Sequence, residues 1–164
     1  MNNTDNYMNF IANAKFPAGN RDEDLYFLFQ DKMILIKEDM GKVFIPTFKD
    51  IKNLIDGLEI IYHLGTFKGI HCFCGEISSC IKITGELKFI ALRQGSAIIE
   101  KDIVPVCGRA AQIIHFHKTN KFCGVCGGEN EFVGYEFAMK CKKCEYMSYP
   151  QVCPAIIVGI TDRK

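Results

Sequence analysis

The sequence feature that most restricts the fold is a pair of Cys-x2-Cys motifs near the C-terminal end. Cys123 and Cys126 form the first motif, Cys141 and Cys144 form the second, and 14 residues separate the two. Two residues between paired cysteines let a tight turn direct both sulfurs toward one Zn²⁺, at about 2.3 Å each. A hairpin between the motifs would bring the second turn opposite the first and complete a tetrahedron. We therefore predict a zinc ribbon over residues 121–149, with these four cysteines as ligands.

The predicted zinc is structural rather than catalytic, because four thiolates leave no open coordination position. The four sulfurs would carry a formal charge near −2 together with the metal, which the flanking lysines would offset: Lys121, Lys140, Lys142 and Lys143. The alternatives are two chance motifs or a redox-active dithiol. The spacing favours zinc over both.

The remaining cysteines do not repeat with ligand spacing. Free cysteine commonly packs as a small buried hydrophobe, which predicts core positions for Cys72, Cys74, Cys80 and Cys107. His115 and His117 lie two residues apart on a predicted helix and so face different directions. We interpret them as interface or surface residues rather than as a shared metal site.

Composition places the chain among globular proteins and argues against a general polyanion-binding surface. Of its 164 residues, 48% are hydrophobic and 24% are charged, and the net charge is only +1. No apolar run is long enough to span a membrane. The N-terminal residues are rich in Asn and Asp and lack the pattern of a secretory signal, which predicts a cytoplasmic protein with reduced thiols.

Hydrophobic periodicity predicts an α+β chain with a mixed-sheet N-terminal domain. Alternating or β-branched runs predict strands at 25–30, 32–37, 43–45, 59–64, 69–73 and 87–92. Apolar residues at helical spacing predict a helix at 48–55 that ends at Gly57, and a longer linking helix at 102–120 with Asp102 as its N-cap. The last apolar run, 154–161, predicts one more buried strand.

The segment from Gly108 to Gly127 resembles the helix and first zinc knuckle of the Nudix NADH pyrophosphatases, also described as NAD-capped RNA hydrolases. The resemblance continues through 136–141 and 149–160 and is loose before residue 87. It implies four parts: an N-terminal α+β domain (1–101), the linking helix (102–120), the zinc ribbon (121–149) and the first strand of a Nudix domain (150–164). It also implies a homodimer.

Four further positions match substrate contacts of that family. Glu136 and Tyr149 match residues that contact the dinucleotide, Arg93 resembles a substrate-binding arginine suited to phosphate, and Lys37 is the fourth candidate. Each has a plainer interpretation. Arg93 is then an exposed charge, Glu136 pairs with a lysine across the hairpin, and Tyr149 covers the small core of the ribbon.

The catalytic signature of the family is missing from these 164 residues. Nudix enzymes hold Mg²⁺ or Mn²⁺ with an Arg-Glu-x2-Glu-Glu cluster, and no arginine here precedes a glutamate. We therefore expect a truncated, non-catalytic part of an NAD(H) diphosphatase that hydrolyses the pyrophosphate of NADH, or of NAD-capped RNA, to NMNH and AMP.

Two other functions remain open on the sequence alone. A stand-alone zinc ribbon could bind nucleic acid or a protein partner through the lysines around the second motif. A redox switch built on the Cys-x2-Cys motifs is the less favoured reading, since no thioredoxin-like βαβ pattern surrounds them.

Overall fold

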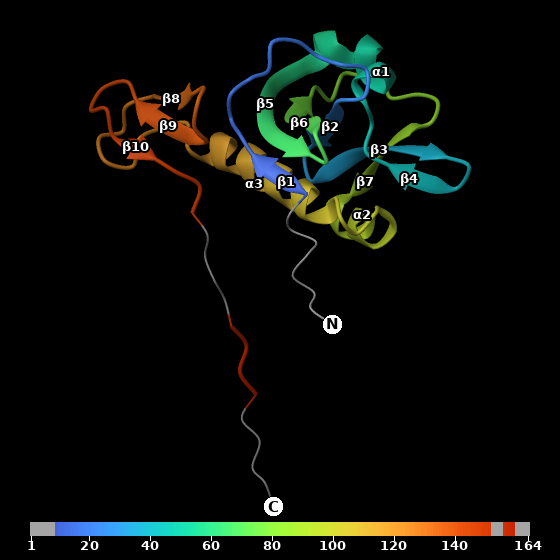
Figure 1. The fold of residues 1–164 in the computed structure, drawn as a ribbon. Coiled ribbons are helices and arrows are strands. Elements are labelled where there is room, and N and C mark those ends of the chain that lie inside the picture. The colour runs from blue at the N-terminus through green and yellow to red at the C-terminus, as the bar shows by residue number, and fades with distance from the viewer. Residues whose placement is uncertain (1–8, 152–155, 160–164) are drawn as a thin grey trace, which may run out of the picture.

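The computed structural model describes residues 9–151 and 156–159, which form a mixed sheet, a long helix and a small second sheet (Figure 1). The large sheet has seven strands, ordered β1-β5-β6-β2-β3-β4 with β7 paired to β3. β2 and β6 are parallel and the other pairs are antiparallel. The bounds are β1 Phe10–Ala12, β2 Leu25–Gln30, β3 Met33–Asp39, β4 Lys42–Phe44, β5 Leu58–Phe67, β6 Ile70–Ile77 and β7 Leu87–Ala91.

Both faces of this sheet are covered, which explains why β2 is apolar at nearly every position. Phe27 and Phe29 belong to the core cluster on the face that carries the long helix α3 (Val104–Thr119). Tyr26 and Leu28 point to the other face and pack with Ile51 of α1 (Phe48–Ile51). The 3-10 helix η2 (Lys52–Gly57) continues α1, and α2 (Leu92–Ile98) follows β7. A strand buried on both faces loses the alternation of a half-exposed one.

The long helix α3 crosses the sheet and carries the chain to the second sheet (Figure 1). Its buried residues include Cys107 and Ala110, which join the core cluster that also holds Cys72 and Cys74 of β6. Small side chains at these four positions let the helix backbone approach the sheet closely. The core predictions for Cys72, Cys74 and Cys107 are therefore confirmed, whereas the prediction for Cys80 is wrong, because that residue is exposed in the turn after β6.

The second sheet is a three-stranded antiparallel hairpin unit, ordered β10-β9-β8. Its strands are β8 Asn130–Val133, β9 Ala138–Cys141 and β10 Met147–Ser148. It docks on the first domain through three rings: His117 of α3 lies 4.0 Å from Tyr62 of β5 and 4.7 Å from Phe132 of β8, between ring centroids. Within the first domain, Lys118 of α3 forms an ion pair with Glu76 of β6, at 2.8 Å.

The α+β class is confirmed, and the differences from the predicted elements are local. Asp102 is not the N-cap of α3, because Ile103 occupies that position and Pro105 follows within the first turn, where its missing N–H costs nothing. The helix predicted over 48–55 changes after one α-helical turn into a 3-10 helix. Two elements were not predicted, the edge strand β1 and the helix α2.

Half of the predicted strand at 154–161 lies outside the described residues. Within it, residues 156–159 form no regular element, and Ile156, Ile157 and Val158 are exposed. The domain boundaries inferred from the sequence stay predictions. None of the helices in the described part of the chain combines the length and apolarity needed to cross a bilayer.

His117 makes the docking of the two sheets sensitive to pH. Its ring is 5% exposed, and neither nitrogen has a hydrogen-bond partner within the described residues. Burial lowers the pKa of His117 to about 4, against about 6.5 in an unfolded chain. The unfolded state therefore binds a proton first as the pH falls, so the free energy of unfolding decreases through this window.

Between pH 7 and pH 5.5, the free energy of unfolding of the wild-type chain should fall by about 1 kcal/mol more than that of His117→Phe. Phenylalanine keeps the ring contacts and cannot be protonated. Urea unfolding at the two pH values measures the difference, with His115→Phe as the control, because His115 is exposed on the same helix. Equal pH dependence of the two variants would contradict the assignment.

Candidate zinc centre and the adjoining cavity

The sulfur atoms of Cys123, Cys126, Cys141 and Cys144 converge on one point. All four lie within 4.8 Å of one another, and they form the only cluster of three or more potential metal ligands found among the described residues. The Sγ atoms of Cys123 and Cys144 are 3.7 Å apart, and those of Cys126 and Cys141 are 3.5 Å apart. A zinc ion with four sulfurs at 2.3 Å requires separations of about 3.8 Å, so the donor set fits tetrahedral zinc.

The two Cys-x2-Cys turns have the same backbone hydrogen bonds. The amide of Gly127 donates to the carbonyl of Cys123 at 2.9 Å, and the amide of Glu145 donates to the carbonyl of Cys141 at 3.0 Å. Gly127 and Glu145 both have positive φ angles, of 69° and 60°. The residue that follows the second cysteine of each motif thus reverses the chain behind the sulfurs, which is easy for glycine and costs more for glutamate.

Backbone amide groups of both motifs point at the sulfurs. Val125 donates to the Sγ of Cys123 at 3.4 Å, and Lys143 and Cys144 donate to the Sγ of Cys141 at 3.3 and 3.4 Å. The bonds from Cys144 and Lys143 lower the pKa of the Cys141 thiol, whereas hydrogen bonds with the neighbouring sulfurs raise that of the Cys144 thiol. Zinc binds thiolates, so the lowered pKa of Cys141 favours binding at neutral pH.

Two of the four lysines around the centre are paired with nearby glutamates of the ribbon. Lys142 contacts Glu129 at 2.7 Å and Lys140 contacts Glu145 at 3.3 Å. Such exposed pairs contribute little stability. They do reduce the local basic surface that a nucleic-acid-binding ribbon would present, so the structure does not favour that alternative.

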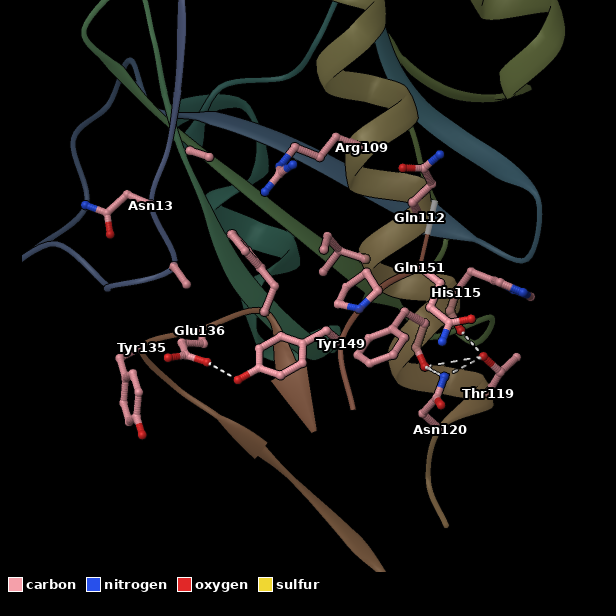
Figure 2. A pocket seen from close by; sticks show the side chains of 16 residues that line it. Asn13, Arg109, Gln112, His115, Thr119, Asn120, Tyr135, Glu136, Tyr149 and Gln151 are labelled. Carbon is pink, nitrogen blue, oxygen red and sulfur yellow. Dashed lines mark hydrogen bonds between the residues drawn. The ribbon is translucent and has the colours of Figure 1, made fainter. Parts of the chain in front are cut away.

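A cavity of about 780 Å³ lies beside the ribbon, between α3, the segment after β1 and the β8–β9 turn (Figure 2). Tyr149 and Glu136 lie on its wall and contact each other, because the Tyr149 hydroxyl donates to the Glu136 carboxylate at 2.8 Å. This bond raises the pKa of Tyr149. Two of the four predicted substrate contacts therefore lie together, with half of the Tyr149 side chain exposed.

The structure does not agree with the plainer interpretations of Glu136 as a partner of a lysine and of Tyr149 as a cover of the ribbon core. Glu136 accepts a hydrogen bond from a tyrosine and has no lysine partner among the described residues. Tyr149 is 51% exposed, so it does not fill the core of the ribbon. Their roles in binding stay predictions, but the pair forms a fixed polar and aromatic wall.

Arg93 and Lys37 lie elsewhere. Arg93 is in the first turn of α2 rather than in a turn between elements, and it lines a second, mostly apolar cavity of about 940 Å³. The two cavities are neighbours, since His115 and Thr119 of α3 line both. Lys37 lies on β3, about 13 Å along the strand from Met33. Met33 pairs with Ala91, the last residue of β7, which lies two residues before Arg93.

Lys37 is already engaged by carboxylates. Its ammonium group contacts Asp50 at 2.8 Å and Glu86 at 3.5 Å. The hydrogen bond to Asp50 raises the pKa of Lys37, and Asp50 also caps α1 by accepting from Thr47. The structure gives Lys37 a structural partner and does not bring it to the cavity of Tyr149.

Arg109 is a cavity residue that the sequence did not single out. It lies on α3 between the buried Cys107 and Ala110, and its guanidinium extends from the helix toward the side where Asn13 lies (Figure 2). The predicted linking helix contains Arg109, but nothing in the sequence distinguished it from an exposed charge. Only the structure shows that the guanidinium faces a cavity.

The seven-stranded sheet, the helix that leaves it and the four-sulfur ribbon together define an α+β domain joined to a zinc ribbon. The chain belongs to the family described as NADH pyrophosphatase-like rudimentary NUDIX domain, whose family model matches residues 23–115. That match covers the sheet from before β2 and most of α3.

Curated relatives share part of the chain. It is 39% identical over 75 residues to the NAD-capped RNA hydrolase NudC of Haemophilus influenzae (strain PittEE), a match that covers 46% of this chain and 28% of the relative. It is 34% identical over 98 residues to NudC of Pseudomonas putida (strain W619), covering 60% and 35%. The chain thus spans about a third or less of the relatives it matches.

We expect Cys141→Ser to abolish stoichiometric zinc binding and to unfold the ribbon, because three thiolates and few buried side chains cannot hold the turns. Cys80→Ser is the matched control, since Cys80 is an exposed thiol outside the cluster. Metal analysis should give one zinc per chain for wild type and the control. The amide signals of residues 122–148 should lose their chemical-shift dispersion only in Cys141→Ser. If the signals of that variant stay dispersed, the assignment of Cys141 as a zinc ligand is contradicted.

Proposed function

We propose that this chain is the N-terminal and zinc-ribbon part of a metal-dependent NAD(H) diphosphatase. The complete enzyme would hydrolyse the pyrophosphate of NADH to NMNH and AMP, or cleave the same bond in NAD-capped RNA. The observation that carries the proposal is the Tyr149–Glu136 pair at the rim of a cavity, in a chain whose relatives are named NAD-capped RNA hydrolases.

In this proposal the chain binds and orients rather than catalyses. A nucleobase or nicotinamide ring can stack on the exposed face of Tyr149, since base–aromatic stacking needs only a free π-face. The bond to Glu136 fixes the ring orientation before the ligand arrives, which reduces the entropy lost on binding. Arg93 would meet a phosphate from the neighbouring cavity. Lys37 is the fourth candidate contact, although its two carboxylate partners make it the weakest.

Mg²⁺ or Mn²⁺ would activate water and clamp the pyrophosphate oxygens in the complete enzyme. The described residues do not fit that role, because their one metal-ligand cluster is the four-cysteine set. Carboxylates from outside these 164 residues would supply the site, and no step is assigned to this chain. A cytoplasmic location and a homodimer belong to the same proposal.

The first experiment compares NADH hydrolysis, with Mg²⁺ or Mn²⁺, by this chain and by the longest natural reading frame that contains it. We expect one zinc in each protein and hydrolysis only by a protein that includes a Nudix signature. A longer protein that leaves both NADH and NAD-capped RNA intact would overturn the proposal.

The binding role of Tyr149 is tested in that longer protein. We expect Tyr149→Ala to lower kcat/KM for NADH about tenfold or more, because one stacking contact is worth roughly 1–3 kcal/mol. Tyr146→Ala is the control, because Tyr146 is also 51% exposed in the ribbon but does not line the cavity. Similar kinetics for the two variants would remove Tyr149 from the site.

A further inference from the structure

Arg109 is a partly buried cation with no anionic partner among the described residues. It forms no ion pair with any described carboxylate, although nine such pairs occur elsewhere in the described chain. Its Nε is buried and has no hydrogen-bond acceptor. Charged side chains that leave water are normally paired, because an unpaired buried charge is costly.

The contacts that Arg109 does make are with aromatic rings. Its guanidinium carbon lies 4.9 Å from the ring centroid of Phe137 in the β8–β9 turn and 5.9 Å from that of Phe10 in β1. These cation–π contacts hold the side chain in place, and no described residue accepts a hydrogen bond from its N–H donors. A fixed guanidinium with free donors is suited to a planar or tetrahedral oxyanion.

No carboxylate of the cavity neutralises this charge. Glu136 is the one acidic residue that lines it, and its Oε2 accepts a hydrogen bond from Tyr149 rather than from Arg109. The rest of the wall suits a nucleotide: Gln112 and Gln151 supply amides that form no hydrogen bonds within the described residues, and Tyr149 supplies a ring. The volume, about 780 Å³, lies in the range of small-ligand sites.

We propose that Arg109 is a phosphate-binding residue and that this cavity is a nucleotide phosphate subsite. The inference rests on the proposed function for the identity of the ligand as a nucleotide. It adds a residue and a subsite to that function. The same chemistry is offered by the pyrophosphate of a free dinucleotide and by the backbone phosphate at the 5′ end of an RNA strand.

The test measures binding to the 164-residue chain itself, by calorimetry for NAD, AMP and adenosine and by fluorescence anisotropy for a short 5′-phosphorylated single-stranded RNA. Arg109→Gln removes the charge and the fork of donors, and Arg109→Lys keeps the charge alone. Arg21→Gln is the matched control, because Arg21 is exposed and does not line the cavity. Zinc content and thermal unfolding establish that each variant is folded.

We expect Arg109→Gln to weaken binding of at least one phosphate-bearing ligand about tenfold or more, since hydrogen bonds to charged groups are the strong ones. Arg109→Lys should lose less, Arg21→Gln should match wild type, and adenosine should not distinguish the variants. For RNA, the slope of log K against log salt should fall by about one. Loss for NAD and AMP assigns the dinucleotide as the source, and loss for RNA alone assigns the strand.

The proposal is overturned if Arg109→Gln binds every phosphate ligand as wild type does, if Arg21→Gln weakens binding equally, or if the wild-type chain binds none of them. These outcomes are separate from the hydrolysis experiment. A longer protein that hydrolyses NADH equally well with and without Arg109 would keep the proposed function and remove the subsite.

Discussion

The contact between α3 and the sheet determines where the ribbon and its cavity lie. Cys107 and Ala110 of the helix meet Cys72 and Cys74 of β6 in one core cluster, and each of these side chains is 1% exposed or less. Because all four are small, the backbones lie close, and a larger side chain at any of them would push the helix away. The same helix then supplies Arg109 to the cavity and His117 to the docking of the ribbon.

The ribbon itself depends on metal and on this docking more than on a core of its own. Its buried hydrophobic residues are Cys123, Ala138, Met139 and Cys141, and two of these are ligands. A unit of this size cannot bury enough apolar surface to be stable alone. The ring contacts of His117 with Tyr62 and Phe132 therefore connect the two sheets, even though the imidazole nitrogens have no hydrogen-bond partner in the described part of the chain.

Most local structure followed from sequence patterns, whereas the pairings between distant segments did not. The strands at 25–30 and 87–91 and the end of α3 at Thr119 were predictable, because alternation, β-branching and helical spacing are local signals. β1 has three residues and exists through its pairing with β5, and α2 contains Gly95 and lacks a capping side chain. The parallel pairing of β2 with β6 was not predictable, because nothing in the sequence of either strand specifies the other as its partner.

The residues of the candidate site also fall into those that the sequence predicts and those that only the fold shows. The four cysteines were predictable from spacing, and Glu136 and Tyr149 were named from resemblance before their hydrogen bond was seen. Arg109 was not identified, because an arginine on an apolar stripe is usually read as a charge that reaches solvent along its stem. Its lack of an acidic partner is a property of the folded arrangement, in which Phe10 and Phe137 come from segments far apart in sequence.

The two zinc turns share their hydrogen bonds but not their residue at the left-handed position. Glycine at 127 reaches a φ of 69° without strain, while glutamate at 145 adopts 60° against its preference. In the metal-free chain the first turn is therefore the better preorganised of the two, and zinc capture should begin at Cys123 and Cys126. The second turn would close only after ligation supplies the energy for its strained residue, which makes metal loading an ordered process.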